Sequence, residues 1–172
     1  MTQTTKSLAM FILSIGFLIS PILALADLDH ANRLIIVEIE NRKLKFYENG
    51  EIKKEFSVRV GKKETPTPVG EGYIFEKRER AIFRYHDPPN KGKIIRWSQL
   101  SNGQNVLIDY GKIKALGFRI NNCDSDKYSI HSVTDPETIG KAISGGCVGI
   151  NIEDMLELFP LVELGTKIVI KP

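Results

Sequence analysis

The stretch LIIVEIENRKLKFYENGEIKKEFSVRV, residues 34–60, determines the class of fold that this sequence predicts. Apolar and polar side chains alternate through three short runs, at 34–40, 43–47 and 54–60, and this is the period of a half-buried β-strand. The last two runs are joined by Asn49-Gly50, a pair that suits a tight hairpin because both residues tolerate positive φ. We therefore expect an antiparallel meander of three strands and a β-rich fold.

The rest of the chain continues this pattern with two interruptions. Residues 62–72 contain too many prolines and glycines for a regular element, so we expect an ordered loop there, and its composition leaves open a simple connector with a solvated charge cluster. Residues 78–101 mix charged, aromatic and turn residues without a period, which is typical of a lid or binding loop or of a variable surface insertion. Further strands are expected at 73–77, 106–110, 116–120, 128–131 and 167–170.

Two short helices are expected in the last third of the chain. Asp135 is placed to cap the first, with Pro136 at its first helical position, and one or two turns ending near Ser144 would fold the chain back. The second begins at Asn151 and would bury one apolar face, made of Ile152, Met155, Leu156 and Phe159. The predicted fold class is thus mixed α+β and β-rich, with one or two short helices.

Composition limits the classes of function. The chain has 172 residues, 42% hydrophobic and 26% charged, which suits one globular domain with an ordinary core. Its net charge of +3 is too weak an excess to indicate nucleic-acid binding. His86 beside Asp87 invites a metal-site interpretation, but no second His or Cys lies at ligand spacing, so no metal is expected.

The N-terminus has the features of a secretory signal peptide. Lys6 precedes an apolar run at 8–19, and Ala24-Leu25-Ala26 supplies a small-residue cleavage site. The alternative is an uncleaved anchor in the inner membrane, because the apolar stretch is just long enough to span a bilayer. We expect cleavage near Ala26 and export to the periplasm, followed by a linker at 27–33 and one domain at 34–172.

A second stretch, residues 128–151, contains residues that suit nucleophilic catalysis. His131 is followed after a spacer by the run Ser144-Gly145-Gly146-Cys147. An adjacent imidazole can convert a thiol to the reactive thiolate, and glycines let a tight turn bring its N–H groups close to a substrate carbonyl. A lone Cys also commonly packs as a small hydrophobe, so the spacing alone leaves a structural role open.

In several segments the sequence resembles the YkuD-type L,D-transpeptidases, bacterial cell-wall enzymes with a catalytic cysteine. The matching segments, in the order of the family, are 60–62, 65–70, 130–132, 139–140, Ser144, 146–148, Asn151, 164–166 and 168–170. The likeness covers about residues 34–170. It implies a YkuD-like sheet or sandwich, with the short helices beside the catalytic cysteine, and no metal or organic cofactor. It also implies that the loop at 62–72 leads back to the sheet near the active cleft.

The resemblance also implies the roles of individual residues. Cys147 would be the nucleophile and His131 the general base, with the backbone carbonyl of Ser132 orienting the imidazole. The N–H groups of Gly146 and Cys147 would hold the oxyanion. Ser144 and Gly145, beside the cysteine, are candidate substrate contacts. Independently of the resemblance, a binding loop at 78–101 would offer four more, Tyr85, His86, Arg96 and Trp97, which in a variable insertion would be ordinary surface residues.

Two positions depart from the family pattern. Gly145 stands where the family usually has histidine, and Gly149 where it often has arginine. Because an arginine can clamp a carboxylate with two N–H donors, Gly149 leaves open how this chain would hold the terminal carboxylate of a peptide. If Cys147 lies close before the helix at residue 151, the positive end of the helix dipole would also favour the thiolate.

The expected function is that of an L,D-transpeptidase that acts on peptidoglycan stem peptides through a thioester, with an amine of a second peptide or of a wall-attached protein as acceptor. The alternatives are an L,D-carboxypeptidase or amidase with the same chemistry, and an inert wall-binding domain. A disulfide is a further alternative, because two cysteines in an exported chain often pair, and a bond from Cys123 to Cys147 would silence the nucleophile.

Overall fold

The structure is a computed structural model, and it describes residues 32–84, 88–123 and 126–172. The predicted signal peptide, most of the predicted linker, and the candidate contacts Tyr85 and His86 lie outside these ranges. Within them, no helix has both the length and the apolar character needed to cross a bilayer.

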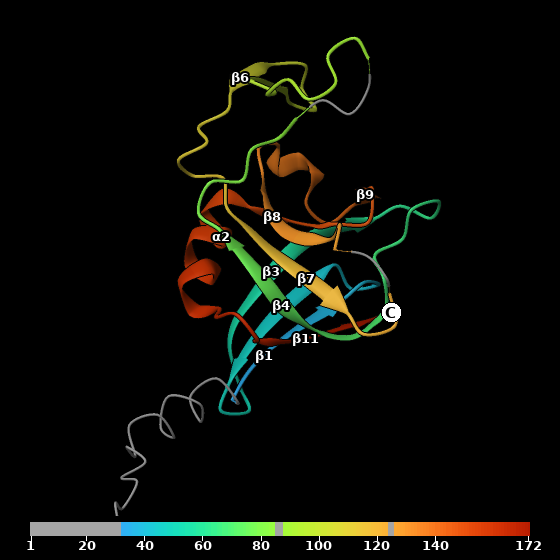
Figure 1. Cartoon of the computed structure of the whole chain (residues 1–172), viewed down its shortest axis with the longest axis vertical. Coiled ribbons are helices and arrows are strands. Elements are labelled where there is room, and N and C mark those ends of the chain that lie inside the picture. Colours follow the sequence, from blue (N-terminus) through green and yellow to red (C-terminus); the bar gives the residue numbers. More distant parts are fainter. Residues whose placement is uncertain (1–31, 85–87, 124–125) are drawn as a thin grey trace, which may run out of the picture.

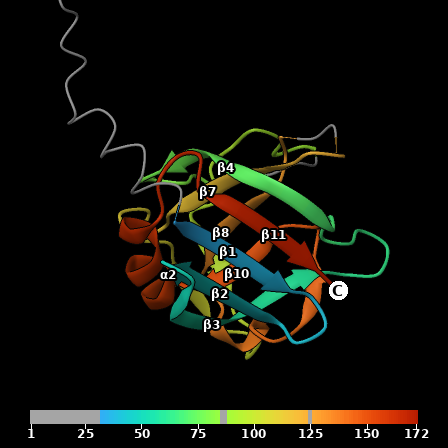
Figure 2. The same cartoon turned by 90° about the horizontal axis from the view of Figure 1, so that it is seen from below.

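One large sheet dominates the fold. Its strands are β1 (Arg33–Glu38), β2 (Lys43–Glu48), β3 (Glu51–Gly61), β4 (Gly70–Arg78), β7 (Ala115–Ile120), β8 (Ser129–Val133), β9 (Ala142–Ser144), β10 (Val148–Asn151) and β11 (Lys167–Lys171). They lie in the order β10-β8-β7-β4-β11-β1-β2-β3-β9, and β10 also pairs with β3, which closes the sheet into a barrel. Figure 2 shows β4, β11, β1, β2 and β3 side by side, with β8 and β10 behind them.

The predicted meander is confirmed. β1 pairs with β2 and β2 with β3, both antiparallel, and the turn between β2 and β3 has positive φ at Asn49 (54°) and Gly50 (78°). Alternate side chains of the strands fill the barrel with apolar residues, among them Ile35, Val37, Leu44, Phe46, Val58, Ile74, Phe118, Ile150 and Ile168. Burial of this surface supplies the main driving force for the fold.

The predicted loop at 62–72 is shorter than expected, because β4 begins at Gly70. Gly70 pairs with Ile170 of β11, and Gly72 pairs with residues of both β11 and β7. A Cβ on Gly72 would lie 1.7 Å from the backbone oxygen of Arg119, so the backbones approach too closely for any side chain at this position. These glycines belong to the sheet, where they permit close strand packing.

The irregular segment after β4 contains a strand that the sequence did not predict. β5 (Trp97–Gln99) pairs antiparallel with β6 (Asn105–Leu107) in a separate two-stranded sheet, and β6 lies above the barrel in Figure 1. The strand predicted at 106–110 is therefore wrong in its second half. There the chain turns instead, with the N–H of Lys112 donating to the carbonyl of Asp109 at 3.0 Å.

The helix predicted after Asp135 is a single 3-10 turn, η1 (Pro136–Thr138). Asp135 caps it as predicted, because its side chain accepts a hydrogen bond from the N–H of Glu137. The expected continuation to Ser144 is wrong. Gly140 has φ of 81° and ends the turn, and residues 142–144 form β9, which pairs in parallel with the end of β3.

The second predicted helix is present as α2 (Ile152–Leu158), followed by the 3-10 turn η2 (Phe159–Leu161). Of the predicted buried face, Met155 and Phe159 are buried and Ile152 is half-buried, but Leu156 is 40% exposed and Leu158, which was not predicted, is fully buried. Residues three apart share a helix face, so Met155 and Leu158 point to the barrel together. Figure 1 shows α2 against one side of the barrel.

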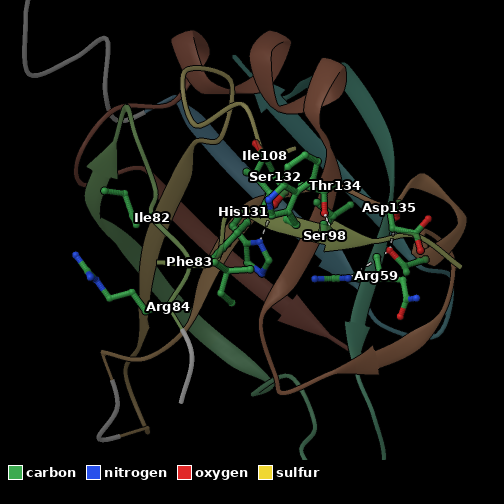
Figure 3. A pocket seen from close by; sticks show the side chains of 15 residues that line it. Arg59, Ile82, Phe83, Arg84, Ser98, Ile108, His131, Ser132, Thr134 and Asp135 are labelled. Carbon is green, nitrogen blue, oxygen red and sulfur yellow. Dashed lines mark hydrogen bonds between the residues drawn. The ribbon is translucent and has the colours of Figure 1, made fainter. Parts of the chain in front are cut away.

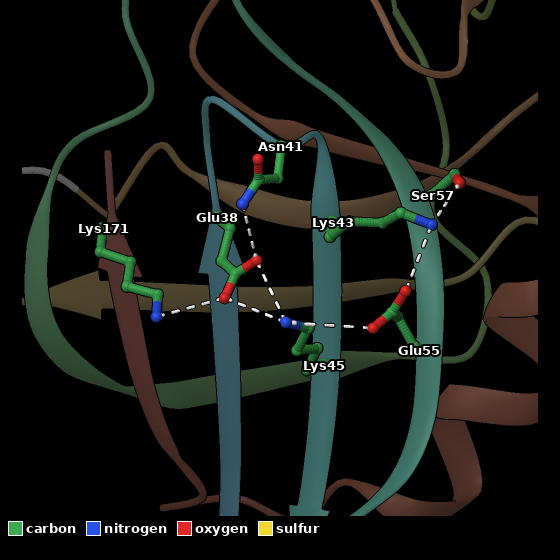
Figure 4. Close-up of polar contacts among 7 residues, drawn as sticks. All are labelled: Glu38, Asn41, Lys43, Lys45, Glu55, Ser57 and Lys171. Carbon is green, nitrogen blue, oxygen red and sulfur yellow. Dashed lines mark hydrogen bonds and ion pairs between the residues drawn. The ribbon is translucent and has the colours of Figure 1, made fainter.

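Glu38, at the end of β1, anchors a network of charged side chains outside the core (Figure 4). Its carboxylate accepts from Asn41 at 3.1 Å and lies 3.1 Å from Lys45 Nζ and 3.2 Å from Lys171 Nζ. The hydrogen bond from Asn41 and those from the two lysines lower the pKa of Glu38 to about 2. The stabilisation is therefore complete above the ordinary carboxyl pKa and is lost as the pH falls towards 2.

We expect Glu38→Gln to lower the free energy of unfolding by about 1–2 kcal/mol at pH 7, because charged hydrogen bonds to a nearly buried carboxylate are lost. Urea denaturation checks this, and the difference from the parent should shrink as the pH falls below about 4.5. The matched control is Glu51→Gln, whose exposed pair with Lys53 should contribute almost nothing. Equal losses in the two variants would contradict this role of Glu38.

Candidate active site

The pairing of β8 with β10 brings the predicted base and nucleophile to one region. The two strands are parallel, with Gly149 opposite His131, and Cys147 lies just before β10. The Sγ of Cys147 is 3.9 Å from the Oγ of Ser129 and 3.8 Å from the carbonyl oxygen of Lys127. Ser129 and His131 alternate onto the same face of β8, about 7 Å apart along the strand. The imidazole and the thiol therefore lie on the same side of the barrel wall.

His131 is held by the main chain. Its Nδ1 lies 2.9 Å from the carbonyl oxygen of Ser132, and its ring packs edge-on against Phe83 with centroids 5.6 Å apart. A carbonyl only accepts, so Nδ1 carries the proton and Nε2 is left as the acceptor. The expected contact from Ser132 is thus present through its carbonyl. The hydroxyl of Ser132 is used elsewhere, accepting from the N–H of Lys114 at 3.1 Å.

Burial sets the protonation state of this ring. Desolvation lowers the pKa of His131 to about 4, with further lowering by the charges of Arg59 and Arg78, and the Ser132 carbonyl opposes the shift. The imidazole is therefore neutral at neutral pH, which is the form that can accept a proton.

The turn before Cys147 is built around the buried hydroxyl of Ser144. This hydroxyl donates to the carbonyl of Cys147 at 2.6 Å and accepts from the N–H of Gly146 at 3.1 Å. Both of its neighbours are main-chain groups of the turn, so Ser144 shapes the turn and its side chain does not face the cavity. The Gly146 N–H, expected as an oxyanion donor, is engaged with Ser144 in this conformation.

Two cavities flank the pair. One, of about 770 Å³, is lined by His131, Arg59, Trp97 and neighbouring residues (Figure 3). The other, of about 520 Å³, is lined by Cys147, Gly145, Tyr128 and residues 64–66 and 68 of the loop before β4. That loop does lead to the cleft, as predicted. Of the other candidate contacts, Gly145 and Trp97 each line a cavity, whereas Arg96 is exposed and lines neither.

The family profile described as the L,D-transpeptidase catalytic domain (YkuD) matches residues 32–170. This chain belongs to the YkuD L,D-transpeptidase family. A Bacillus licheniformis relative named "Putative L,D-transpeptidase YkuD" is 30% identical over 140 residues, which are 80% of this chain and 65% of the relative. The chain thus spans slightly less than two thirds of the length of that relative.

Solved L,D-transpeptidases share the fold. The catalytic domain of the Enterococcus faecium L,D-transpeptidase is 26% identical, with a TM-score of 0.55 over 81% of this chain and 96% of that domain. The structure of the Ldtfm-avibactam carbamoyl enzyme is 25% identical, with a TM-score of 0.60 over 82% of this chain and 49% of that one. The β-rich fold expected from the resemblance is confirmed, in the form of a barrel-like sheet that carries, within the described residues, a single short α-helix.

In this member of the L,D-transpeptidase family, the expected help from a helix dipole is absent. β10 occupies the four residues between Cys147 and α2. An extended segment of that length places the sulfur more than about 10 Å from the first turn of the helix. The dipole effect falls off within that first turn, so the prediction is wrong for this transpeptidase fold.

The two cysteines of this L,D-transpeptidase family member are both free thiols. Cys123 packs at the edge of the main core, and Cys147 lines the smaller cavity. The alternative of a disulfide between them is not the state of this structure. Within residues 32–84, 88–123 and 126–172, no group of three or more His, Cys, Asp or Glu side chains is placed to hold a metal ion.

The two glycines before Cys147 differ in what they tolerate. Gly146 has φ of 113°, and a Cβ there would lie 2.6 Å from the Tyr128 ring, whereas a Cβ on Gly145 would have nothing within 4 Å. We expect Gly146→Ala to cost about 1–3 kcal/mol in stability and to slow alkylation of Cys147 at least about tenfold. Gly145→Ala should change stability by less than about 0.5 kcal/mol. Thermal unfolding and thiol alkylation check both, and similar behaviour of the two variants would contradict the geometry.

One site residue, Arg59, escaped the sequence analysis. It lies in the middle of β3, in a segment whose alternation indicates only a strand, and no motif singles it out. The structure places it opposite Gly149 and in the wall of the larger cavity. Only the cross-strand register reveals this, because the two residues are ninety positions apart in the sequence.

Proposed function

We propose that this chain is an L,D-transpeptidase that forms a thioester between Cys147 and a peptidoglycan stem peptide. The observation that carries the proposal is the placement of Cys147 beside Ser129, with His131 on the same face of β8 and its Nδ1 held by the Ser132 carbonyl. A thiol on the same side of the barrel wall as an oriented, neutral imidazole is an arrangement from which cysteine acyl transfer can proceed.

The first half of the reaction transfers an acyl group to sulfur. Nε2 of His131 takes the proton of the Cys147 thiol, and the thiolate attacks the carbonyl carbon of the amide between meso-diaminopimelate and D-alanine. The C–N bond then breaks, and the imidazolium returns its proton to the amine of the leaving D-alanine. Since the Gly146 N–H is engaged with Ser144, we assign the oxyanion to the N–H of Cys147 itself.

The second half releases the acyl group to an acceptor. His131 takes a proton from an incoming amine, whose nitrogen attacks the thioester carbonyl, and the sulfur leaves as a thiolate that is reprotonated. The acceptor amine belongs to a second stem peptide or to a wall-attached protein. The two cavities, one beside His131 and one beside Cys147, support transfer between two peptides, since each offers a separate approach to the reacting pair.

Two further observations support the proposal. The similar Ldtfm structure is a carbamoyl enzyme formed with avibactam, so a relative at 25% identity carries a covalent adduct. The basic and apolar N-terminus with its small-residue site also fits export, which would bring the domain to the periplasm and its wall substrate.

Product analysis tests the function. Purified protein is incubated with a stem tetrapeptide ending in meso-diaminopimelate and D-alanine, and the products are identified by mass spectrometry. Transfer predicts a cross-linked dimer of peptides accompanied by one released D-alanine per bond formed. Release of D-alanine without a dimer, at high acceptor concentration, would instead establish a carboxypeptidase. No reaction with the tetrapeptide would favour an inert wall-binding domain.

A further inference from the structure

Arg59 covers a position where its partner strand has no side chain. Arg59 of β3 and Gly149 of β10 are direct cross-strand neighbours. A Cβ on Gly149 would lie 2.5 Å from both Cγ and Nε of Arg59, so the arginine occupies the volume that any larger residue at 149 would need. Gly149 is therefore required for the present path of the Arg59 side chain. The family often has an arginine at position 149, and here a guanidinium reaches the same region from the opposite strand.

Among the residues that the structure describes, no carboxylate forms an ion pair with Arg59. Its Nη1 donates to Thr138 Oγ1 at 3.3 Å, its Nε is buried without a hydrogen bond, and no carboxylate of the described residues lies within ion-pair distance. Asp135 lines the same cavity, but its carboxylate accepts from the N–H and hydroxyl of Ser101 at 2.8 and 2.6 Å. Within the described residues this half-buried cation lacks a direct counter-ion, and the cost in free energy favours binding of an anion from outside.

The guanidinium projects into the larger cavity. Figure 3 shows it extending from β3 towards His131, and both residues line the space of about 770 Å³. Burial lowers the pKa of Arg59, while the negative charges of an ionised Cys147 and of Asp135 oppose this shift. The arginine thus lies within electrostatic reach of both reacting groups. A carboxylate in this cavity would accept hydrogen bonds from the Nη groups while its peptide passes the His131 imidazole.

We propose that Arg59 binds the terminal carboxylate of the peptide substrate, presented by β3 across the space that Gly149 leaves open on β10. The inference rests on the proposed function, in which the cleaved amide belongs to a residue with a free carboxylate. That carboxylate is separated from the reacting carbonyl by only a few bonds. A fixed cation beside the reacting pair would therefore select peptides that end one residue after the cleaved bond.

The first experiment compares two forms of one donor peptide, the stem tetrapeptide as its free acid and as its C-terminal amide. The parent protein should prefer the acid. Arg59→Met should lower kcat/KM for the acid by about 10- to 100-fold, because a hydrogen bond to a charged group contributes about that much. The same variant should change kcat/KM for the amide little. Arg59→Lys should recover part of the preference, because it keeps the charge without the planar fork. The control is Lys54→Met, which removes an exposed cation from the same strand and should leave the preference intact.

One outcome of this comparison would contradict carboxylate binding by Arg59. If Arg59→Met slows the acid and the amide by the same factor, Arg59 only supports the fold or the reacting pair, and the proposal is wrong while the transpeptidase function stands. Thermal unfolding of each variant separates loss of fold from loss of recognition.

The second experiment needs no peptide, so it holds even if the proposed function fails. Iodoacetate and iodoacetamide alkylate a thiolate by the same chemistry, and only iodoacetate carries a carboxylate. At Cys147 the ratio of their rates should be at least about threefold higher in the parent than in Arg59→Met, since removal of one nearby cation weakens attraction of the anion. Any change in the acidity of the thiol affects both reagents and cancels in the ratio.

Cys123 supplies an internal reference, because peptide mapping measures its two alkylation rates in the same samples. Its ratio should be the same in the parent, Arg59→Met and Lys54→Met. An unchanged ratio at Cys147 in Arg59→Met would show that Arg59 does not recruit carboxylates to the site, whatever reaction the site performs.

Discussion

Cys147→Ser is expected to lower kcat/KM for peptide transfer by at least about 10³-fold. A serine hydroxyl is a far weaker acid and a poorer nucleophile than a thiol, so the same imidazole activates it much less. Neither the fold nor the cavities should change, because the two side chains differ by one atom. Steady-state rates with the tetrapeptide donor measure the loss, and thermal unfolding checks the fold.

Cys123→Ser is the matched control. Cys123 packs at the edge of the core and is not among the residues that line the cavity beside Cys147, so its replacement should retain the activity of the parent. If Cys123→Ser were inactive and Cys147→Ser active, the result would show that Cys147 is not the nucleophile.

His131→Gln is expected to lower kcat/KM by about 10²- to 10⁴-fold, the usual contribution of a general base. Glutamine keeps a polar side chain of similar reach but cannot accept a proton at neutral pH. The expected loss is confined to the chemical step, so binding of a non-reacting peptide to the variant should be unchanged by calorimetry. Equal weakening of binding and rate would point to a structural role instead.

The pH profile of the parent provides a sharper test of the same residue. The base works only when neutral, and the folded pKa lies below the ordinary value of about 6.5, so activity should persist through pH 6 and decline only near pH 4. Stability follows the same shift. Protonation favours the unfolded state as the pH falls from about 6.5 towards 4, so His131 contributes to acid destabilisation in that window. An acid limb centred near 6.5 would contradict the lowered pKa of the half-buried imidazole.

Local sequence signals predicted the elements of this fold well where they acted alone. The alternation of residues 34–60 and the Asn49-Gly50 turn specify the meander, and Asp135 with Pro136 specifies a cap. The signals failed where long-range pairing decided the outcome. Gly70 and Gly72 look like loop residues but serve close strand packing, and residues 142–144 pair with β3 instead of continuing a helix. In both cases the strand that pairs with these residues is distant in the sequence, so local patterns do not reveal the pairing.

In the candidate site, too, the sequence predicted some features and missed others. His131, Cys147 and the carbonyl of Ser132 follow from an ordered set of motifs, because each keeps its place relative to the others along the chain. The engagement of the Gly146 N–H by Ser144 and the approach of Arg59 to Gly149 depend on three-dimensional contacts between side chains and backbone. The spacing of residues along the chain does not reveal such contacts. The sequence therefore indicated only that position 149 lacks the usual arginine, whereas the structure places Arg59 of β3 opposite it.

Intact-mass spectrometry of the protein, acid-quenched after brief exposure to the stem tetrapeptide, would detect the acyl-enzyme itself. We expect a mass increase equal to the tetrapeptide minus D-alanine, mapped by proteolysis to Cys147 and absent from Cys147→Ser. An adduct on Cys123, or none on any residue while D-alanine is released, would contradict thioester catalysis by Cys147.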